Sequence, residues 1–218
     1  MVRKIKGQPS AVFLHIPRTG GSFIEKALQE CTVRTSRWTK NKAVGNVPRK
    51  HVTKDLLNPE AIKKIDHYFA FVRDPITYYP SVWMWLKRSV SEKIFNWDWH
   101  PLGDPASVWD DDFNEWARRM AEEKPAWAFR LFEKYCGTEE NPICSFVGRT
   151  ERIEKDFCSF CSDVLGYDTR YWPMILAEMG RKNVARSHRP GWEADALDAV
   201  YASEADFYRR WGGLDALA

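Results

Sequence analysis

The residues best suited to chemistry by type and spacing lie in the stretch 11–23, AVFLHIPRTGGSF. A short apolar run meets Pro17 and then two adjacent glycines, Gly20 and Gly21. This pattern predicts a strand that passes through a tight turn into a helix over residues 21–31. Glycine permits a positive φ and a close backbone approach, so N–H groups at the start of the helix can converge on one point. The positive end of the helix dipole favours an anion there.

Three other side chains of this turn add to its preference for an anion. Arg18 supplies a cation, and Thr19 and Ser22 supply hydroxyl groups. A phosphate or sulfate ester is the expected ligand, because such groups bind where N–H donors and positive charge meet. The common phosphate loop that ends in Gly-Lys-Ser/Thr is not present, since the spacing of the glycines differs from it.

A second polar group follows another apolar run, in the stretch 68–85, YFAFVRDPITYYPSVWMW. Arg73, Asp74 and a proline come directly after the run, and Ser81 lies eight residues after the arginine. Asp74 is expected to shape the turn, as aspartate often does. Ligands of parallel α/β sheets bind beyond the carboxyl ends of the strands, so both polar groups are expected to face one pocket.

The stretch PRTGGS resembles the PKTGGT loop of the sulfotransferases, particularly the group that modifies carbohydrates. In that family the loop binds the 5′-phosphosulfate of 3′-phosphoadenosine 5′-phosphosulfate (PAPS). The resemblance implies that residues 18–22 and Phe23 bind PAPS, and that Arg73 and Ser81 hold its 3′-phosphate. Two later stretches are also similar to family segments, which extends the likeness over most of the chain: 145–157 and 183–192.

Three positions depart from the family pattern. Arg18 stands where the family usually has lysine, which keeps the charge but replaces a compact ammonium with a planar fork. Tyr78 stands where a second arginine of the 3′-phosphate motif is often found, and Trp83 replaces a usual tyrosine. Arg186 or Arg189 is therefore expected to supply part of the binding to the 3′-phosphate.

Sulfuryl transfer moves SO3 from a phosphate oxygen to an acceptor, so the protein must stabilise the departing phosphate and accept a proton. Arg18 suits the first task, because negative charge grows on the phosphate as the bond breaks. His51 is the predicted base, since neutral imidazole accepts a proton near neutral pH and similar sulfotransferases carry a histidine there; a solvent-facing or capping histidine is the alternative. Glu25 is the second candidate base. His15 lies within the first strand and is expected to be packed.

Length and periodicity predict one α/β domain over residues 1–218, with helices alternating with the strands of a parallel sheet. The resemblance implies a P-loop-like, three-layer α/β/α fold. The expected strands are Ala11–Ile16, Tyr68–Val72, Ile143–Val147 and a shorter Val47–Val52. A final helix is expected over residues 194–211, with an apolar stripe made by Leu197, Val200, Tyr201, Phe207, Tyr208 and Trp211.

The composition of the chain limits which partners and which cellular location are expected. A net charge of +3 with mixed signs argues against a nucleic-acid surface, and the basic residues within 1–10 predict a solvated tail. No stretch approaches the roughly 20 apolar residues of a membrane span, and an odd number of cysteines, five, favours a reducing, cytoplasmic location. No metal is expected. Cys158 and Cys161 lie in a helical pattern in which Ile153, Phe157, Phe160, Cys161 and Val164 share one face, which predicts buried thiols. A metal site that uses Cys136, Cys144, Cys158 and Cys161 is the alternative.

Seven of the eleven tryptophans lie between residues 83 and 127. Within this region the segment 96–112, NWDWHPLGDPASVWDDD, mixes indoles with carboxylates and shows no clear period. The segment is expected either to contact a glycan or other small-molecule acceptor as a lid, or to pack as an ordinary loop. The spacing of Phe113, Trp116, Ala117 and Met120 predicts the buried face of a helix.

The predicted function is transfer of a sulfuryl group from PAPS to an acceptor hydroxyl, with a carbohydrate favoured as the acceptor. Two alternatives remain. A nucleotide or small-molecule kinase would need a Mg²⁺ site and a Walker lysine, and neither is visible in the sequence. A non-catalytic relative that binds adenosine phosphates is suggested by Arg18 and Tyr78, two of the three departures from the family pattern.

Overall fold

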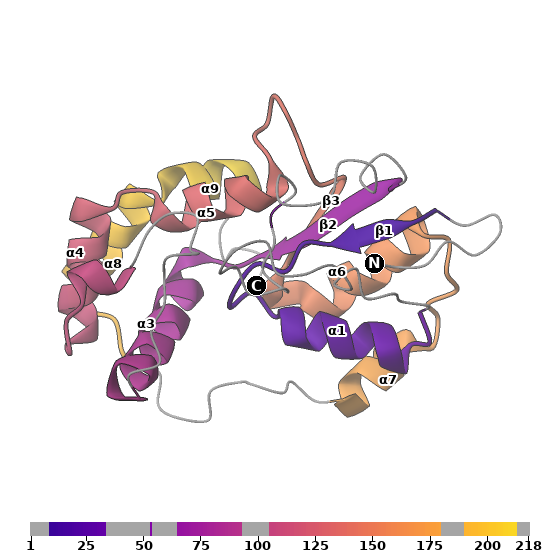
Figure 1. The fold of residues 1–218 in the computed structure, drawn as a ribbon, viewed down its shortest axis with the longest axis horizontal. Helices are drawn as coiled ribbons and strands as arrows, with labels where there is room; N and C mark the ends of the chain where they lie inside the picture. Colours follow the sequence, from indigo (N-terminus) through magenta and orange to yellow (C-terminus); the bar gives the residue numbers. More distant parts are fainter. Residues whose placement is uncertain (1–8, 34–52, 54–64, 93–104, 180–189, 213–218) are drawn as a thin grey trace. The chain divides into compact units, whose positions relative to one another are not determined.

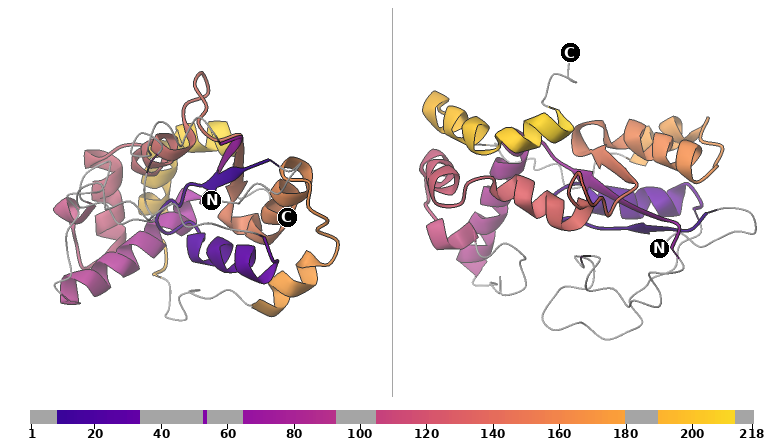
Figure 2. Two further views of the ribbon diagram at one scale, coloured as in Figure 1. Left: turned by 45° about the vertical axis from the view of Figure 1, so that its right-hand side comes forward. Right: turned by 90° about the horizontal axis from the view of Figure 1, so that it is seen from above.

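A computed structural model describes residues 9–33, 53, 65–92, 105–179 and 190–212 (Figure 1; two further views in Figure 2). The chain divides into two compact units. Unit 1 comprises residues 1–72 and 135–184, and unit 2 comprises residues 73–134 and 185–218. One domain over residues 1–218 stays a prediction.

Unit 1 is built on a parallel sheet of three strands in the order β1-β2-β3: β1 (Ala11–Phe13), β2 (His67–Val72) and β3 (Phe146–Arg149). Ala11 pairs with His67, and Val72 pairs with Arg149. The predicted parallel sheet is confirmed, and β2 lies where it was expected. Strand β3 is shifted along the chain, since it begins at Phe146 and not at Ile143 and ends at Arg149 and not at Val147. Strand β1 is shorter than expected, since it ends at Phe13 and not at Ile16. Beyond its end, the N–H of Leu14 still donates to the carbonyl oxygen of Phe69 over 2.8 Å. The fourth expected strand, Val47–Val52, lies outside the described residues.

The helical elements of unit 1 are α1 (Gly21–Glu30), η3 (Thr150–Arg152), α6 (Ile153–Ser159), the π-helical η4 (Phe160–Val164) and α7 (Trp172–Met179). One apolar core joins α1, α6, η4 and α7 to the sheet. Phe69 projects from β2 into this core and stacks on Phe160, with ring centroids 4.1 Å apart. Parallel strands need such helical cover, since they bury both faces. The chain is thus mixed α/β, whereas the three-layer, P-loop-like arrangement stays a prediction.

Unit 2 contains α3 (Pro75–Glu92), η2 (Pro105–Val108), α4 (Phe113–Glu123), most of α5 (Trp127–Cys136), α8 (Ala194–Ser203) and α9 (Ala205–Trp211). Its core is aromatic: Tyr79 packs against both Trp116 and Trp127. The predicted buried face of α4 is confirmed, since all four residues of the pattern are at most 3% exposed. No helix within the described ranges has the length and apolar character needed to cross a membrane.

Helix α3 contains Pro80, which has no N–H to donate to the carbonyl group four residues earlier. That carbonyl belongs to Ile76, and the indole Nε1 of Trp192 donates to it over 3.2 Å. A side chain from outside the helix thus satisfies the acceptor that the proline leaves open. The indole lies 116 positions along the chain from the carbonyl group, so no local pattern in the sequence indicates this hydrogen bond.

The single helix expected over residues 194–211 is wrong: Glu204 separates α8 from α9. The Glu204 side chain is fully buried, and its carboxylate accepts hydrogen bonds from the hydroxyl group of Tyr79 (2.8 Å) and the N–H groups of Ala128 and Phe129 (both 2.9 Å). It therefore caps the first turn of α5, where the helix dipole favours negative charge. Burial nonetheless raises the pKa of Glu204 above its ordinary value. In the expected apolar stripe Val200 and Phe207 are buried, but Tyr201 is exposed.

Candidate functional site

The predicted anion loop of unit 1 is a turn over residues 17–20 that leads directly into α1. Gly20 precedes the helix with a left-handed backbone, φ 85° and ψ 11°, as its glycine identity predicted. The carbonyl oxygen of Gly20 accepts the N–H groups of Phe23 (2.8 Å) and Ile24 (3.2 Å). Among the first four N–H groups of α1, those of Gly21 and Ser22 have no such acceptor in the described part of the chain.

Arg18 has a left-handed backbone as well, with φ 65°. This conformation is uncommon for a residue with a Cβ atom, and the sequence predicts a positive φ at the glycines alone. The Arg18 side chain is half-buried, and Ser22 is exposed on the first turn of the helix. The cation and two N–H groups thus belong to one short segment of backbone whose shape is set by residues 18 and 20.

Thr19 is fully buried, and its hydroxyl group donates to the carbonyl oxygen of Ile16 over 3.0 Å. The hydroxyl therefore stabilises the turn, and donation to a ligand would require this bond to break. Phe23 places its side chain in the apolar core of unit 1. Contact of Thr19 or Phe23 with PAPS stays a prediction.

His15 is buried as expected, and its ring stacks on Phe13 with centroids 5.5 Å apart. The ring lies against Gly21, so that a Cβ atom placed on this glycine would be 1.9 Å from His15 Nε2. His15 Nδ1 lies 3.1 Å from a carboxylate oxygen of Glu25, the second candidate base, whose side chain is half exposed. Gly21 is therefore required for close packing between the first strand region and α1.

Replacing Gly21 with alanine should destabilise the protein by about 1–3 kcal/mol, because the new methyl group overlaps the His15 ring. Chemical denaturation of the wild type, Gly21→Ala, His15→Ala and the double variant measures this as a double-mutant cycle. The cost of the methyl group should be largely relieved once the imidazole is removed. An equal cost in both backgrounds would show that the overlap is not its origin.

The Arg73 motif begins unit 2. Arg73 is half-buried, and its Nε donates to the hydroxyl group of Thr77 over 3.0 Å. Asp74 is fully buried, and its carboxylate accepts the N–H of Ile76 over 2.9 Å and the hydroxyl group of Tyr208 over 3.3 Å. Asp74 thus shapes the start of α3, as predicted. Burial, followed by the charge of Asp74, raises the pKa of Tyr208.

Two aromatic departures from the family motif lie in the packing of unit 2. Tyr78 is 1% exposed and stacks on Trp127. Trp83 is also buried, stacks on Trp109 with centroids 5.8 Å apart, and carries the ammonium group of Lys87 over its ring. Tyr78 therefore has a packing role at the position of the missing arginine. Ser81, on the same helix, is 5% exposed.

The described part of segment 96–112 supports ordinary packing for its last tryptophan. Trp109 is half-buried against Trp83, and the indole of Trp83 donates to the carbonyl oxygen of Asp110. Residues 96–104 lie outside the described residues. His51, Arg186 and Arg189 lie outside them too, so the predicted base and the additional 3′-phosphate contacts stay predictions.

The cysteines are free thiols. On the expected helical face Ile153, Phe157, Phe160 and Cys161 are buried, whereas Val164 is only partly buried. Cys158, which was also expected to be buried, is half-buried. Burial raises the pKa of Cys158 and Cys161, and it raises that of Cys31 to about 11. Protonated, buried thiols are inert. Cys136, Cys144, Cys158 and Cys161 do not form a group that could hold a metal ion.

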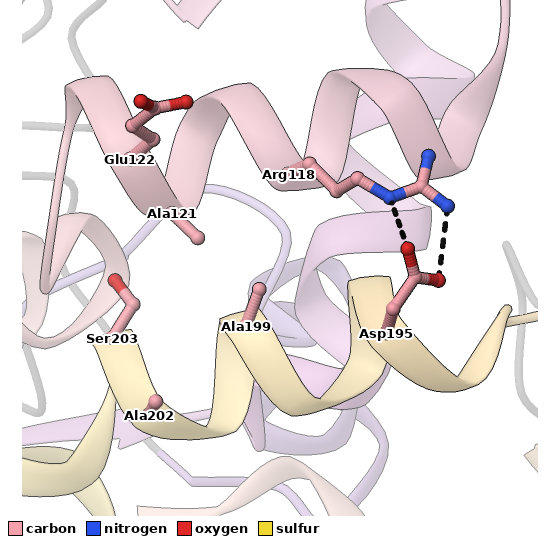
Figure 3. Close-up of a pocket in the computed structure, with 7 residues that line it drawn as sticks. All are labelled: Arg118, Ala121, Glu122, Asp195, Ala199, Ala202 and Ser203. Carbon is pink, nitrogen blue, oxygen red and sulfur yellow. Dashed lines mark hydrogen bonds and ion pairs between the residues drawn. The ribbon is translucent and has the colours of Figure 1, made fainter.

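Unit 2 also has a surface groove between α4 and α8, of about 440 Å³ (Figure 3). Small residues form its floor, among them Ala121, Ala199 and Ala202. Arg118 at its edge is bound by the carboxylates of Asp195 and Glu193, which raise the pKa of the guanidinium. A cation already neutralised in this way is a poor anion site, and none of the sequence-predicted site residues lines the groove.

Comparison with models of protein families, with curated proteins and with solved structures found no match to this chain. The candidate site is therefore identified by the geometry of residues 17–22 and by the motifs that they resemble.

Proposed function

We propose that the protein is a PAPS-dependent sulfotransferase whose donor 5′-phosphosulfate binds at the start of α1. The observation that carries this proposal is the backbone of the turn. Left-handed conformations at Arg18 and Gly20 bring the chain into α1 with the N–H groups of Gly21 and Ser22 at its first positions. Such a helix start favours a phosphate or sulfate ester, and PRTGGS resembles the family loop that binds one.

Arg18 would stabilise the phosphate from which SO3 departs. Its guanidinium is always charged and can present two parallel donors to two oxygens. Because charge accumulates on the bridging oxygen as the S–O bond breaks, a fixed cation lowers the barrier more than it strengthens ground-state binding. The acceptor hydroxyl would lose its proton to His51, with Glu25 as the second candidate; Glu25 already lies within hydrogen-bond distance of His15.

The resemblance assigns the 3′-phosphate of the donor to Arg73 and Ser81, with help from Arg186 or Arg189. The bond from Arg73 Nε to the hydroxyl group of Thr77 supports this assignment in part, since it helps to fix the orientation of the guanidinium at the start of α3. A carbohydrate hydroxyl is the proposed acceptor class. It follows from the resemblance and from the indole-rich segment 96–112.

The proposal predicts that 3′,5′-adenosine bisphosphate, the product nucleotide, raises the melting temperature. A ligand that binds only the folded state stabilises it by about 2.7 kcal/mol at a hundredfold excess over Kd. Thermal unfolding should be followed with this nucleotide, with 5′-AMP and with ATP plus Mg²⁺. The bisphosphate should give the largest shift, and 5′-AMP a smaller one because it lacks the 3′-phosphate.

Arg73→Ala is the matched variant for this experiment. It should reduce the shift given by the bisphosphate while leaving the shift given by 5′-AMP nearly unchanged. Stabilisation by ATP plus Mg²⁺ alone would favour a kinase and would contradict the proposal. Binding of the bisphosphate without sulfuryl transfer in a host extract supplied with PAPS would identify a non-catalytic relative instead.

A further inference from the structure

Thr150 touches the anion loop from a distant part of the chain. It is the first residue after β3, and its hydroxyl oxygen lies 2.9 Å from the carbonyl oxygen of Thr19 and 3.0 Å from that of Val72. A hydroxyl group has one hydrogen, which is therefore shared between these two acceptors. Val72 is the last residue of β2, so one side chain links the ends of two strands to the turn that follows the third.

The same segment also packs against Gly20. A Cβ atom on this glycine would lie 2.5 Å from the terminal methyl group of Ile153 and 3.7 Å from the methyl group of Thr150. Gly20 thus lacks a side chain at the point where the start of α6 approaches the turn. The polar contact at Thr19 and the apolar contact at Gly20 act on consecutive residues of the loop.

We propose that Thr150 is a positioning residue of the anion-binding loop: its hydroxyl group holds the carbonyl of Thr19 and so fixes the backbone that presents Gly21 and Ser22. This inference rests on the proposed function, because it assigns to Thr150 a part in binding the donor anion. Thr150 does not contact the ligand in this account. Without the hydroxyl group, the carbonyl groups of Thr19 and Val72, two fully buried residues, would lose this donor. The backbone of the turn would then shift toward other hydrogen-bond partners.

Loss of a positioning residue should increase local opening of the loop, whereas loss of a residue that only stabilises the fold should lower the free energy of global unfolding. Amide hydrogen exchange reports local opening of a segment, whereas denaturation reports unfolding of the whole. Thr150→Val keeps the shape of the side chain and removes the hydroxyl group, and Thr150→Ser keeps the hydroxyl group and removes the methyl group. The pair therefore separates the hydrogen bonds from the packing against Gly20.

The test measures, for wild type and both variants, amide exchange over residues 18–24 in the free protein and the Kd of 3′,5′-adenosine bisphosphate by calorimetry. Thr150→Val should exchange faster in this segment than in α4 and should bind the nucleotide about tenfold more weakly, the equivalent of about 1.4 kcal/mol. Thr150→Ser should restore both values to near those of the wild type.

Unchanged exchange in Thr150→Val, or faster exchange with an unchanged Kd, would overturn the role of Thr150. Failure of the wild type to bind the nucleotide would instead overturn the proposed function. In that case inorganic pyrophosphate serves as the probe. Equal affinity of the wild type and Thr150→Val for pyrophosphate, or no affinity in either, would then overturn the positioning role as well.

Discussion

Replacement of Arg18 by alanine is expected to slow sulfuryl transfer from PAPS by about 10²–10³-fold, the usual effect of removing one preorganised charge stabiliser. The reason is that Arg18 is the cation of the turn and would meet the charge that develops on the departing phosphate. The measurement is a single-turnover rate of 3′,5′-adenosine bisphosphate formation, with excess enzyme and a host extract as the acceptor source. Single-turnover conditions remove product release from the measured rate.

Arg18→Lys is the matched control, because lysine keeps the charge and is the residue that the resembled family has at this position. It should retain most of the rate, with a moderate loss because one ammonium replaces a two-pronged donor. A rate for Arg18→Ala equal to that of the wild type would contradict the role of Arg18 in the transition state. An unchanged rate with a weaker Kd for PAPS would restrict Arg18 to ground-state binding.

The free energy of unfolding of the Glu204→Ala variant is expected to be about 3–5 kcal/mol lower than that of the wild type. Removing one partner from a buried polar cluster leaves the other groups without their hydrogen bonds. The hydroxyl group of Tyr79 and the N–H groups of Ala128 and Phe129 would all lose their acceptor. Urea denaturation at constant pH measures the effect. Tyr79→Phe is the milder control, because it removes one donor and leaves the cap on α5 in place.

The pH dependence of the unfolding free energy independently measures how folding changes the pKa of the Glu204 carboxyl group. Its pKa is raised by burial in the folded protein, so the folded state binds the proton more tightly than the unfolded chain. The contribution of Glu204 to stability is therefore fully present below its ordinary pKa of 4.5 and declines as the pH rises through the raised value. The difference in unfolding free energy between wild type and Glu204→Gln should fall over that interval. A pH-independent difference would show that the pKa is the same in both states.

The secondary structure near the candidate site follows from local patterns in the sequence. An apolar run, a proline and two glycines predicted β1, the turn and α1, and the structure has the helix at Gly21–Glu30. The turn shaped by Asp74 was also predicted, although the helix α3 that follows it was not. These features depend on neighbours within a few residues, so a single sequence contains the information.

Features that depend on distant partners could not be predicted in this way. The break at Glu204 exists because its carboxylate binds donors about 76 and 125 positions earlier in the chain, while the local pattern is that of one amphipathic helix. The role of Thr150 depends on carbonyl groups 131 and 78 positions away. A threonine after a strand gives no local signal of such contacts.

The left-handed backbone of Arg18 has a consequence for how this loop could evolve. A residue with a Cβ atom gives up about 1–2 kcal/mol in this conformation relative to glycine. Selection for heat resistance alone would therefore favour glycine at position 18, and it would thereby discard the guanidinium. Under the proposed function, folding and sulfuryl transfer would make opposite demands on position 18, and a trade-off between stability and turnover would be expected there.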